Sequence, residues 1–574
     1  MEKNSLDNLR HSAAHLLAAA VKQLWPDTHN AIGPSIENGF YQDFDFGKVK
    51  ISEADLPKIE QKMREMLKSW GPFVEKEVSV EQALKDFANN PYKIELIHEF
   101  AKEGKKITEN DPGHFLDLCK GGHSQNPKEE LKHFKLLSIA GAYWRGDEKN
   151  KMLTRIYGTI FPTKEELDKY LWQKEEAKKR DHKILGPKLE LFMFHETAPG
   201  MAYWLPKGVK LYNQLVEFWR NEHEKRGYLE TFSPLLNKKE LFITSGHYDH
   251  YWKDMFVANM GKNEVYGLKA MNCPNAMVIF GFKPRSYKDL PLRISDTDPL
   301  HRFELSGVLN GLLRVRLFRQ DDAHIFVSED QIESEFEKLF EIVERFYSIF
   351  NLTYSFRLGK RPDKFMGDPN VWDHAEHSLE EILKKSGKEY IVAEKEGAFY
   401  GPKIDILMKD TLGRQWQMGT LQLDFQQPAR FKLVYTDAHG KDKTPVAIHR
   451  VIYGSLERFI GILIEHYAGA FPLWLSPIQV KVITVSDKFA AYAKSVHNAL
   501  LKEGIRSELD EENNTVGKKI RQSTLQKIPY TVIIGEREVT AKQCSVRTRE
   551  GKDLGLLRVN DFTNKLKEQI EKFQ

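Results

Sequence analysis

A long and strongly charged helix in the first third of the chain constrains the fold more than any other feature. Thr163 and Glu166 form a capping box, the polar stretch KEELDKYLWQKEEAKKRDHKIL follows, and Gly186-Pro187 is expected to end the helix. A helix with so few apolar residues fits a bridge between domains better than a place in a core. The chain has 574 residues, enough for several domains with cores of their own.

A further domain boundary is expected at FPLWLSP, residues 471–477. Beyond it, the apolar strand pattern IQVKVITV, a helix pattern from Asp487 and the strand pattern YTVIIG alternate, which predicts a small α/β domain. The preceding block mixes helices with many short strands, as α+β domains do. We therefore expect a multidomain α+β protein with domains at 1–162, 188–473 and 474–574, and a linker helix at 163–187.

The composition is that of an ordinary soluble globular protein, with 29% charged and 41% hydrophobic residues. The apolar run at residues 16–21 is too short for a signal peptide or a membrane span, so we expect a cytoplasmic protein without membrane contact. With only three cysteines, Cys119, Cys273 and Cys544, no disulfide framework is expected. Lys and Arg outnumber Asp and Glu over residues 475–574, which is typical of a polyanion contact or of an ordinary soluble surface.

The segment HRFELSG, followed by RVRLFRQDDAHIF, indicates a nucleotide site in the middle of the chain. Two strands joined by a loop would aim Arg302, Arg314 and Arg316 at phosphates, and Phe318 offers a surface for stacking. The chain has no glycine-rich GxxxxGK[ST] phosphate loop, so a different nucleotide fold is implied. Downstream, GSLERFIGILIEHYAG predicts a helix with Arg458 among apolar residues, where an arginine needs a ligand or a carboxylate as partner.

Three segments, in this order, resemble the signature motifs of class II aminoacyl-tRNA synthetases. They are GVKLYNQLVEFWRNEHEKRGYLETFSP, which ends at Pro234, the Arg302–Glu304 pair with its following strand, and the Arg458 helix. The resemblance implies a catalytic domain with an antiparallel sheet over residues 188–473. It also implies a homodimer, because the first motif forms the dimer interface in that family.

The same resemblance implies contacts to ATP. Arg302 would hold the α-phosphate and act as the catalytic residue, and Arg314 would hold the outer phosphates. Phe318 and Arg458 would sandwich adenine, with Glu304 on its amino edge. The other residues implied for this pocket are Lys403, Gln417 and Ser455. The expected chemistry is in-line attack of an amino-acid carboxylate on the α-phosphorus, supported by the arginines and Mg²⁺.

Three possible metal ligands, Cys273 in AMNCPNAM, His324 in QDDAHIF and His449 in VAIHRVIYGS, are far apart in sequence, and each by itself fits a core residue. As a trio they resemble the zinc ligands of the threonyl-tRNA synthetase family, which implies one Zn²⁺ per subunit and one coordination position left for substrate. Threonine would then be recognised through its hydroxyl, whose proton Asp322 accepts, and valine would be rejected. The other residues expected around threonine are Gln320, Met271, Tyr400 and Gln422.

A second site is needed because serine keeps the hydroxyl and lacks only a methyl group, a difference worth roughly 1–3 kcal/mol in a pocket. The sequence HSAAH places His11 and His15 on one helix face, and DLCKGGH places Cys119 and His123 at the same spacing. This set resembles the editing domain of threonyl- and alanyl-tRNA synthetases, which hydrolyses wrong aminoacyl esters.

Lys93 and Asp117 match two further positions of that editing pocket. The four His and Cys side chains could bind zinc, as in the alanyl relatives, or surround a water molecule that acts without metal. We expect the second arrangement, with His11 and Lys93 beside the water. The small extra domain that usually precedes the editing domain in this family is expected to be absent.

The C-terminal α/β domain is expected to read the anticodon through Arg547 and Arg549 in VRTREGKDLG. The complete hypothesis is an enzyme that activates L-threonine with ATP, joins it to tRNA(Thr), and hydrolyses seryl-tRNA(Thr). One alternative is a catalytically weak, synthetase-like regulator that binds tRNA, but such a protein typically loses the ATP arginines or the metal ligands. Another is a free-standing editing hydrolase, which would not need residues 190–574.

Overall fold

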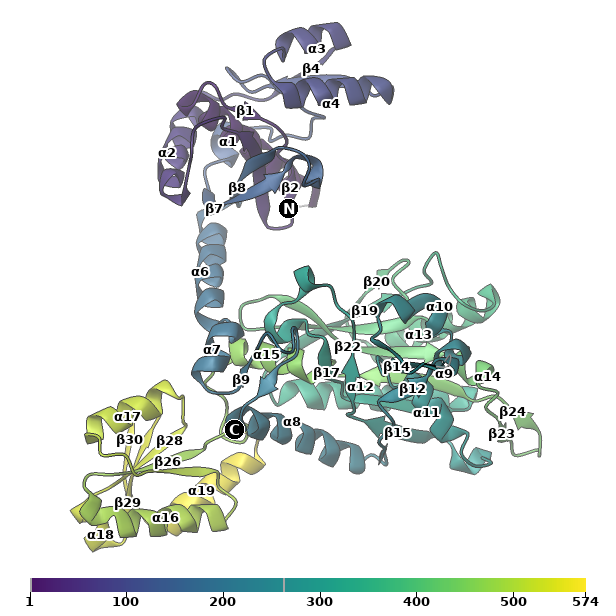
Figure 1. Ribbon diagram of the computed structural model, residues 1–574, viewed down its shortest axis with the longest axis vertical. Helices are drawn as coiled ribbons and strands as arrows, with labels where there is room; N and C mark the ends of the chain where they lie inside the picture. The colour runs from purple at the N-terminus through teal and green to yellow at the C-terminus, as the bar shows by residue number, and fades with distance from the viewer. Residues whose placement is uncertain (1–2, 262–263) are drawn as a thin grey trace. The chain divides into compact units, whose positions relative to one another are not determined.

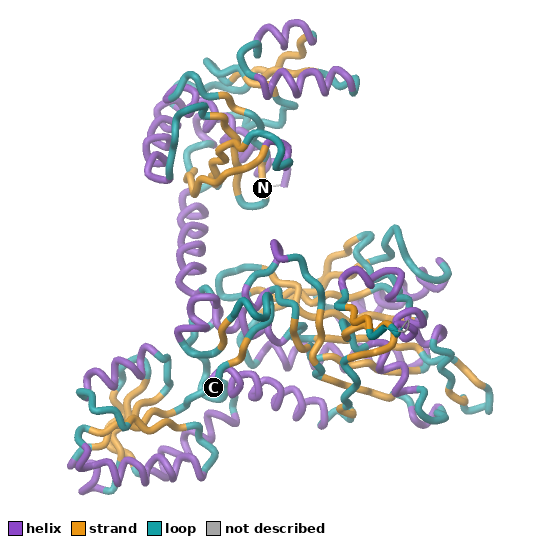
Figure 2. Tube along the Cα trace, viewed as in Figure 1, coloured by secondary structure: helices purple, strands orange, loops and turns teal. Residues whose placement is uncertain are grey.

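The computed structural model describes residues 3–261 and 264–574. The chain divides into two compact units, one ending at Glu175 and the other spanning Glu176–Gln574, and each is described by itself (Figure 1). Helices and strands are interspersed in both units, as expected for an α+β protein (Figure 2). Within the described ranges, every helix is too short or too polar to span a lipid bilayer.

The first unit contains an antiparallel sheet backed by helix α1 (Lys3–Leu24). Its strand order is β1–β3–β8–β7, with β2 also paired to β3. The strands are β1 (His29–Asn30), β2 (Ser35–Ile36), β3 (Gly39–Asp45), β7 (Phe134–Tyr143) and β8 (Met152–Ile160). Ala13, Leu16 and Ala20 recur at helical spacing on α1 and are fully buried, so one face of the helix builds the core together with α2 (Leu56–Leu67).

A smaller layer of the first unit carries further polar residues. Strands β4 (Val74–Val78), β5 (Ile107–Asp111) and β6 (Asp117–Leu118) form an antiparallel sheet, and helices α3 (Val80–Asp86) and α4 (Pro91–Lys102) pack against it. The Asn90 side chain caps α4 by accepting N–H bonds from Tyr92 and Lys93, which places Lys93 in the first helical turn. A short helix, α5 (Pro127–Glu130), precedes β7.

The charged helix predicted at residues 163–187 is two helices. The capping box is confirmed at the start of α6 (Lys164–Arg180), because the Glu166 N–H donates to Thr163 Oγ1 at 3.2 Å and the Thr163 N–H donates to the Glu166 carboxylate at 3.3 Å. The predicted end at Gly186-Pro187 is wrong, since α6 stops at Arg180. The Asp181 side chain then accepts from the Lys183 N–H and starts a second helix, α7 (His182–Lys188), which contains Gly186 and Pro187.

The second unit is organised by an eight-stranded sheet within the described residues, in the order β11–β15–β18–β25–β22–β21–β19–β20. Neighbouring strands are antiparallel except at the two edges, where β11 pairs with β15 and β19 with β20 in parallel. The expected antiparallel sheet is therefore confirmed. The strands are β11 (Leu229–Glu230), β15 (Leu292–Asp296), β18 (Asp322–Val327), β19 (Thr353–Gly359), β20 (Tyr390–Ala393), β21 (Lys403–Lys409), β22 (Gln415–Asp424) and β25 (Val446–Val451).

Four helices share the large core that this sheet helps to form. They are α8 (Pro206–Glu224), α12 (Ile332–Ser348), α13 (Pro369–Ser386) and α15 (Leu456–His466). In α12, Phe336, Phe340 and Val343 recur at helical spacing and are buried. The predicted Arg458 helix is α15, whose first turn is capped by the Ser455 hydroxyl.

Smaller elements surround one end of the sheet. The hairpin of β16 (Pro299–His301) and β17 (Leu317–Arg319) is the predicted pair of strands, but Arg302, Arg314 and Arg316 lie in the loop between them. Nearby pieces are α9 (Lys239–Ser245), α10 (His247–Tyr251), α11 (Cys273–Phe280), α14 (Gln427–Arg430), and the sheet of β12 (Leu236–Lys238), β13 (Val257–Asn259) and β14 (Val265–Leu268). Short two-stranded pairs are β9 (Phe192–Met193) with β10 (Tyr203–Trp204) and β23 (Tyr435–Thr436) with β24 (Asp442–Lys443).

The C-terminal part of the second unit has its own sheet and core, in the predicted α/β order. The strands lie in the order β27–β26–β28–β29–β30. They are β26 (Val480–Thr484), β27 (Ser507–Asp510), β28 (Tyr530–Ile534), β29 (Cys544–Thr548) and β30 (Asp553–Leu557). The helices are α16 (Ala490–Lys502), α17 (Val516–Leu525), α18 (Glu536–Ala541) and α19 (Val559–Glu571).

Candidate functional site

A cationic pocket of about 330 Å³ opens between the β16–β17 loop and the beginning of α15. Most residues predicted to bind ATP line it. The lining comprises Arg302, Glu304, Leu313, Arg314, Val315, Phe318, Gln320, Met418, Gly454, Ser455 and Arg458. Gln320, predicted to contact threonine, belongs to this lining, whereas Lys403 and Gln417 do not.

The arginines of the pocket are held close to aromatic rings and to one another. The Arg302 guanidinium lies 5.0 Å from the Phe318 ring centroid, and that of Arg458 lies 5.7 Å from the ring of Trp416. Glu304 pairs with Arg314 at 2.8 Å. Burial, and then the charge of Arg314, lower the pKa of Arg458, whose buried Nε has no hydrogen-bond partner in the part of the chain that the structure describes. Such a concentration of cations attracts a polyphosphate.

Lys403 and Gln417 belong to a polar cluster around the buried Asp405. Its carboxylate lies 3.1 Å from Lys403 Nζ, accepts from Gln417 Nε2 at 2.9 Å, and pairs with Arg357 at 2.8 Å. Asp405 and Arg357 were missed by the sequence analysis. The alternation in KIDIL could have revealed Asp405, because residues two apart on a strand share one face of the sheet.

Cys273, His324 and His449 come together although no two are near in sequence. His324 and His449 are directly paired across β18 and β25, with ring centroids 4.8 Å apart, and Cys273 begins α11. Their possible ligand atoms all lie within 4.8 Å of one another. His324 is fully buried, and neither its ring nitrogens nor His449 Nδ1 have a hydrogen-bond partner among the described residues. Buried polar atoms without partners need an explanation, and a metal ion supplies one.

The charges around the trio also suit a metal. Burial lowers the pKa of His324 far below its usual value, so its imidazole is neutral and keeps a lone pair for a cation. Burial raises the pKa of the Cys273 thiol. For His449, burial alone would lower the pKa, but the neighbouring Cys273 and the Asp424 carboxylate, 2.8 Å from Nε2, raise it to about 10. A metal ion at this site would have to displace a proton from His449 Nδ1 and the thiol proton of Cys273.

The residues predicted to hold threonine only partly surround the trio. Asp322 accepts a hydrogen bond from Asn272 Nδ2 at 3.0 Å. Tyr400 donates to Gln422, and its ring lies 5.2 Å from that of His449. Met271 is buried in a small apolar cluster against which Cys273 packs. Asn272 and Asp424 were missed, and the signal was local, since each is within two residues of a predicted site residue.

In the first unit, His11, His15, Cys119 and His123 form one compact cluster, as predicted. His11 Nε2 lies 3.1 Å from His15 Nε2 and 3.2 Å from Cys119 Sγ, and His123 Nε2 lies 3.4 Å from the same sulfur. The His123 ring stacks on Phe73 with a centroid separation of 4.0 Å. Helix α1 contributes the first two histidines, and the loop after β6 contributes the other two residues.

Asp117 organises this cluster electrostatically. Its buried carboxylate lies 2.9 Å from His15 Nδ1 and 2.6 Å from Lys93 Nζ. Burial would lower the pKa of His15, but the hydrogen bond to Asp117 and the contact with Cys119 raise it to about 9. Burial would raise the pKa of Cys119, but hydrogen bonds from the histidines lower it to about 3. Cys119 is therefore a thiolate beside an imidazolium at neutral pH.

The two arginines predicted to read the anticodon have different environments. Arg547 is exposed on β29. Arg549 is half-buried, and its Nη1 donates to the carbonyl oxygens of Phe471 and Lys527 at 3.0 and 3.2 Å. Arg547 is thus the better placed of the two to reach a ligand.

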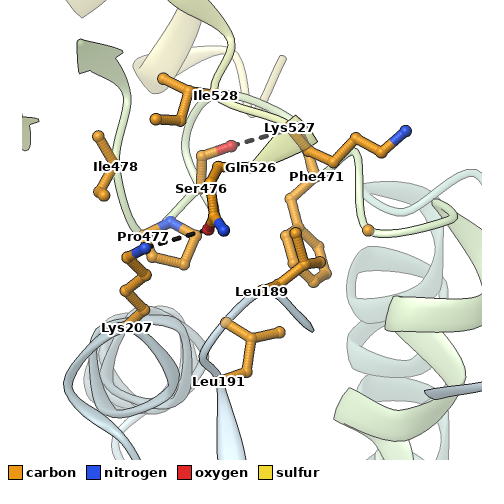
Figure 3. A pocket seen from close by; sticks show the side chains of 11 residues that line it. Leu189, Leu191, Lys207, Phe471, Ser476, Pro477, Ile478, Gln526, Lys527 and Ile528 are labelled. Carbon is orange, nitrogen blue, oxygen red and sulfur yellow. Dashed lines mark hydrogen bonds between the residues drawn. The ribbon is translucent and has the colours of Figure 1, made fainter. Parts of the chain in front are cut away.

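A small crevice where the C-terminal domain meets the large core carries little chemistry (Figure 3). Apolar side chains such as Leu189, Phe471 and Ile528 line most of it. Of its two lysines, Lys207 is already bonded to Gln526 at 3.0 Å and to Glu190 at 2.5 Å. We interpret this crevice as part of a packing junction between domains.

Comparison with known proteins agrees with this geometry. Family models match residues 256–467 (tRNA synthetase class II core domain, of the G, H, P, S and T group), 479–569 (anticodon binding domain) and 106–157 (threonyl and alanyl tRNA synthetase second additional domain). An antiparallel sheet beside an arginine-lined pocket, together with these matches, defines a class II aminoacyl-tRNA synthetase.

Individual relatives narrow the class to one member. The threonine–tRNA ligase of Thermotoga neapolitana is 49% identical over 98% of this chain and 88% of its own length, and that of Acetivibrio thermocellus is 47% identical over 99% and 89%. A solved threonyl-tRNA synthetase structure from Cryptosporidium parvum, described as its RNA binding domain, matches with a TM-score of 0.66 and 41% identity over 68% of this chain and 98% of that one. The chain belongs to the threonine–tRNA ligase family, which confirms the resemblance stated from the sequence.

Proposed function

We propose that this chain activates L-threonine with ATP, transfers it to tRNA(Thr), and hydrolyses seryl-tRNA(Thr) at a separate site. The observation that carries the proposal is the unpartnered, fully buried His324 beside Cys273 and His449, close to a cationic pocket. Gln320 lines that pocket, and Asp322 follows two residues later on the way to His324. Threonine recognition and ATP binding are therefore neighbouring functions of one stretch of chain.

One zinc ion per subunit would be held by Cys273, His324 and His449, and it would supply a Lewis acid that binds the amino group and hydroxyl of threonine. Asp322, oriented by Asn272, accepts the hydroxyl proton. Tyr400 and Gln422, which are hydrogen-bonded to each other, would complete the threonine pocket. Valine has no hydroxyl, so it would leave one coordination bond and the hydroxyl contact to Asp322 unmade, a loss that such a site penalises strongly.

In the activation step, a threonine carboxylate oxygen attacks the α-phosphorus of ATP, the bond to the β-phosphate oxygen breaks, and pyrophosphate leaves. Arg302 neutralises the α-phosphate, and Arg314, released from Glu304, holds the outer phosphates with Mg²⁺. Phe318 and Arg458 stack on adenine. Alignment and charge neutralisation provide most of the rate enhancement that such a site can give.

In the editing step, water attacks the ester carbonyl of seryl-tRNA and gives a proton to His11. The acyl C–O bond then breaks as His11 returns that proton to the 3′-terminal ribose oxygen, which leaves as a hydroxyl. His11 is the half-exposed member of the cluster, so it can reach a water molecule. Lys93 and His15 are buried and bound to Asp117, which holds the pocket in shape. A small cavity rejects an added methyl group more sharply than a large one rejects a missing group, so the editing pocket is expected to accept serine and exclude threonine.

The remaining features belong to the same proposal. The C-terminal domain binds the anticodon through Arg547, the enzyme is a homodimer joined along α8 and β11, and it works in the cytoplasm. The domains run from 1 to 162, from 188 to 473 and from 474 to 574, on either side of the linker at 163–187. Support comes from the separate cores of these parts and from the exposed apolar residues Leu229, Phe232 and Leu236, which follow α8 in the sequence.

ATP–pyrophosphate exchange with threonine, serine and valine tests the proposal. Strong exchange with threonine, weak exchange with serine and none with valine is the expected order. A protein that binds tRNA but shows no exchange with threonine would instead be the regulator considered as the alternative. Strong exchange with valine would contradict recognition through the hydroxyl.

A further inference from the structure

His182, the first residue of α7, joins two parts of the ATP pocket without touching the pocket itself. Its ring is 1% exposed. Nδ1 lies 2.7 Å from a Glu465 carboxylate oxygen, and Nε2 accepts the Leu312 backbone N–H at 3.0 Å. Because Nε2 accepts, Nδ1 carries the proton and donates it to Glu465. Asp181, His182 and Glu465 have the spacing of a metal site, but both ring nitrogens are already used.

The Leu312 contact fixes a loop that carries ATP residues. Leu312 is fully buried, and the next two residues, Leu313 and Arg314, line the pocket. The loop is closely packed at two glycine positions, one on α15 and one in the loop itself. A Cβ atom on Gly461 of α15 would lie 3.1 Å from Leu312 Cβ, and one on Gly311 would lie 2.3 Å from His182 Nε2.

The Glu465 contact leads to the other side of the pocket. The second carboxylate oxygen of Glu465 pairs with Arg414 at 2.6 Å. The Arg414 guanidinium lies 5.1 Å from the Trp416 ring centroid, and Arg458 lies over the same ring at 5.7 Å. Through its two carboxylate oxygens, Glu465 therefore links His182 to Arg414, and Arg414 shares the Trp416 ring with Arg458.

Arg314 and Arg458 repel each other when ATP is absent, and burial removes Arg458 from water as well. Something must hold both side chains in place before the phosphates arrive. We propose that His182 is a positioning residue for ATP: it fixes the Leu312 backbone on one side and Glu465 on the other, so that Arg314 and Arg458 are pre-arranged. The inference rests on the proposed function of the pocket and deepens it.

ATP–pyrophosphate exchange with the full chain tests this role, because KM for ATP should change while KM for threonine should not. His182→Ala is expected to raise KM for ATP about tenfold, the effect of one lost hydrogen bond to a binding loop. KM for threonine should stay within about twofold, because none of the contacts described for His182 involves a residue proposed to bind threonine. Deacylation of seryl-tRNA should not change.

Two conservative variants separate the two contacts. A glutamine amide oxygen reaches the position of Nε2 and can accept from Leu312, so His182→Gln should recover most of the ATP affinity. An asparagine amide nitrogen reaches only the position of Nδ1, so His182→Asn should behave like His182→Ala. Gly461→Ala, which pushes a methyl group against Leu312, should also raise KM for ATP while leaving His182 in place.

The matched control is His466→Ala. His466 is buried on α15, next to Glu465, and among the described residues its ring bonds the Phe350 carbonyl alone, at 3.2 Å. It should lower the unfolding temperature and leave KM for ATP within about twofold. An unchanged KM for ATP in His182→Ala, or equal behaviour of the Gln and Asn variants, would overturn the positioning role. Absence of threonine-dependent exchange in the wild-type protein would instead overturn the proposed function.

Discussion

Replacing Asp424 with asparagine should weaken zinc binding without removing a zinc ligand. Asp424 is fully buried, and one of its carboxylate oxygens lies 2.8 Å from His449 Nε2. The other oxygen accepts the backbone N–H groups of Gln426 and Gln427 at 2.7 and 3.0 Å. An asparagine oxygen can keep the two backbone bonds, so its amide N–H₂ group must then face His449.

That geometry forces a change of tautomer. In the wild-type protein His449 donates from Nε2 to Asp424, so Nδ1 offers its lone pair to the metal once the Nδ1 proton has been displaced. Facing an amide donor, Nε2 has to accept, and the proton moves to Nδ1, where it blocks the metal. Loss of a partner of this kind usually costs 10- to 100-fold in metal affinity, about 1.4–2.8 kcal/mol.

The assay is competition between Asp424→Asn and a chelator of known zinc affinity, followed by exchange kinetics. The zinc dissociation constant should rise 10- to 100-fold, KM for threonine should rise with it at limiting zinc, and KM for ATP should stay unchanged. Asp510→Asn, a buried carboxylate of the C-terminal domain, is the control for a general loss of stability. Unaltered zinc affinity in Asp424→Asn would refute the argument from the His449 tautomer.

Three further predictions concern the other sites. Cys119→Ala should leave threonine charging near normal while seryl-tRNA accumulates, which is measured by charging with serine in parallel with the wild-type protein. Hydrolysis of seryl-tRNA at the wild-type rate would show that the editing site lies elsewhere. His15 has a pKa raised from 6.5 to about 9, so its stabilisation is fully present below pH 6.5 and is lost as the pH rises through 9. The unfolding free energy of wild type should therefore exceed that of His15→Gln by up to about 3 kcal/mol at low pH and converge with it by pH 10. Arg547→Ala should raise KM for tRNA about tenfold without altering ATP–pyrophosphate exchange. Arg549→Ala should mainly lower the unfolding temperature. Equal KM values for tRNA in Arg547→Ala and wild type would contradict the contact assigned to Arg547.

Local signals predicted well wherever a residue's role depends on its neighbours in sequence. The capping box at Thr163 and the helix that carries Arg458 were predicted from a few residues and confirmed, because caps and amphipathic faces are short-range features. The end of the linker helix was mispredicted for a related reason. Asp181 is itself a strong N-cap, so it starts a new helix before Gly186-Pro187 is reached.

The metal trio was predicted only through resemblance, and its assembly is a matter of sheet pairing. His324 and His449 are 125 residues apart, and the register between β18 and β25 brings them opposite each other. No property of either segment alone sets that register, because it results from hydrophobic patterning summed over the entire sheet.

The sequence by itself determined which side chains are available: a set of arginines, one thiol with two imidazoles in the catalytic domain, and a quartet of three histidines and one cysteine in the first unit. Only the tertiary structure decided which partners tune those groups. Asp424 behind His449, Asp117 behind His15 and Glu465 behind His182 each act across 25 residues or more. Hydrogen bonds of this kind depend on positions to within a few tenths of an ångström, and such precision exists only once distant strands and helices have packed.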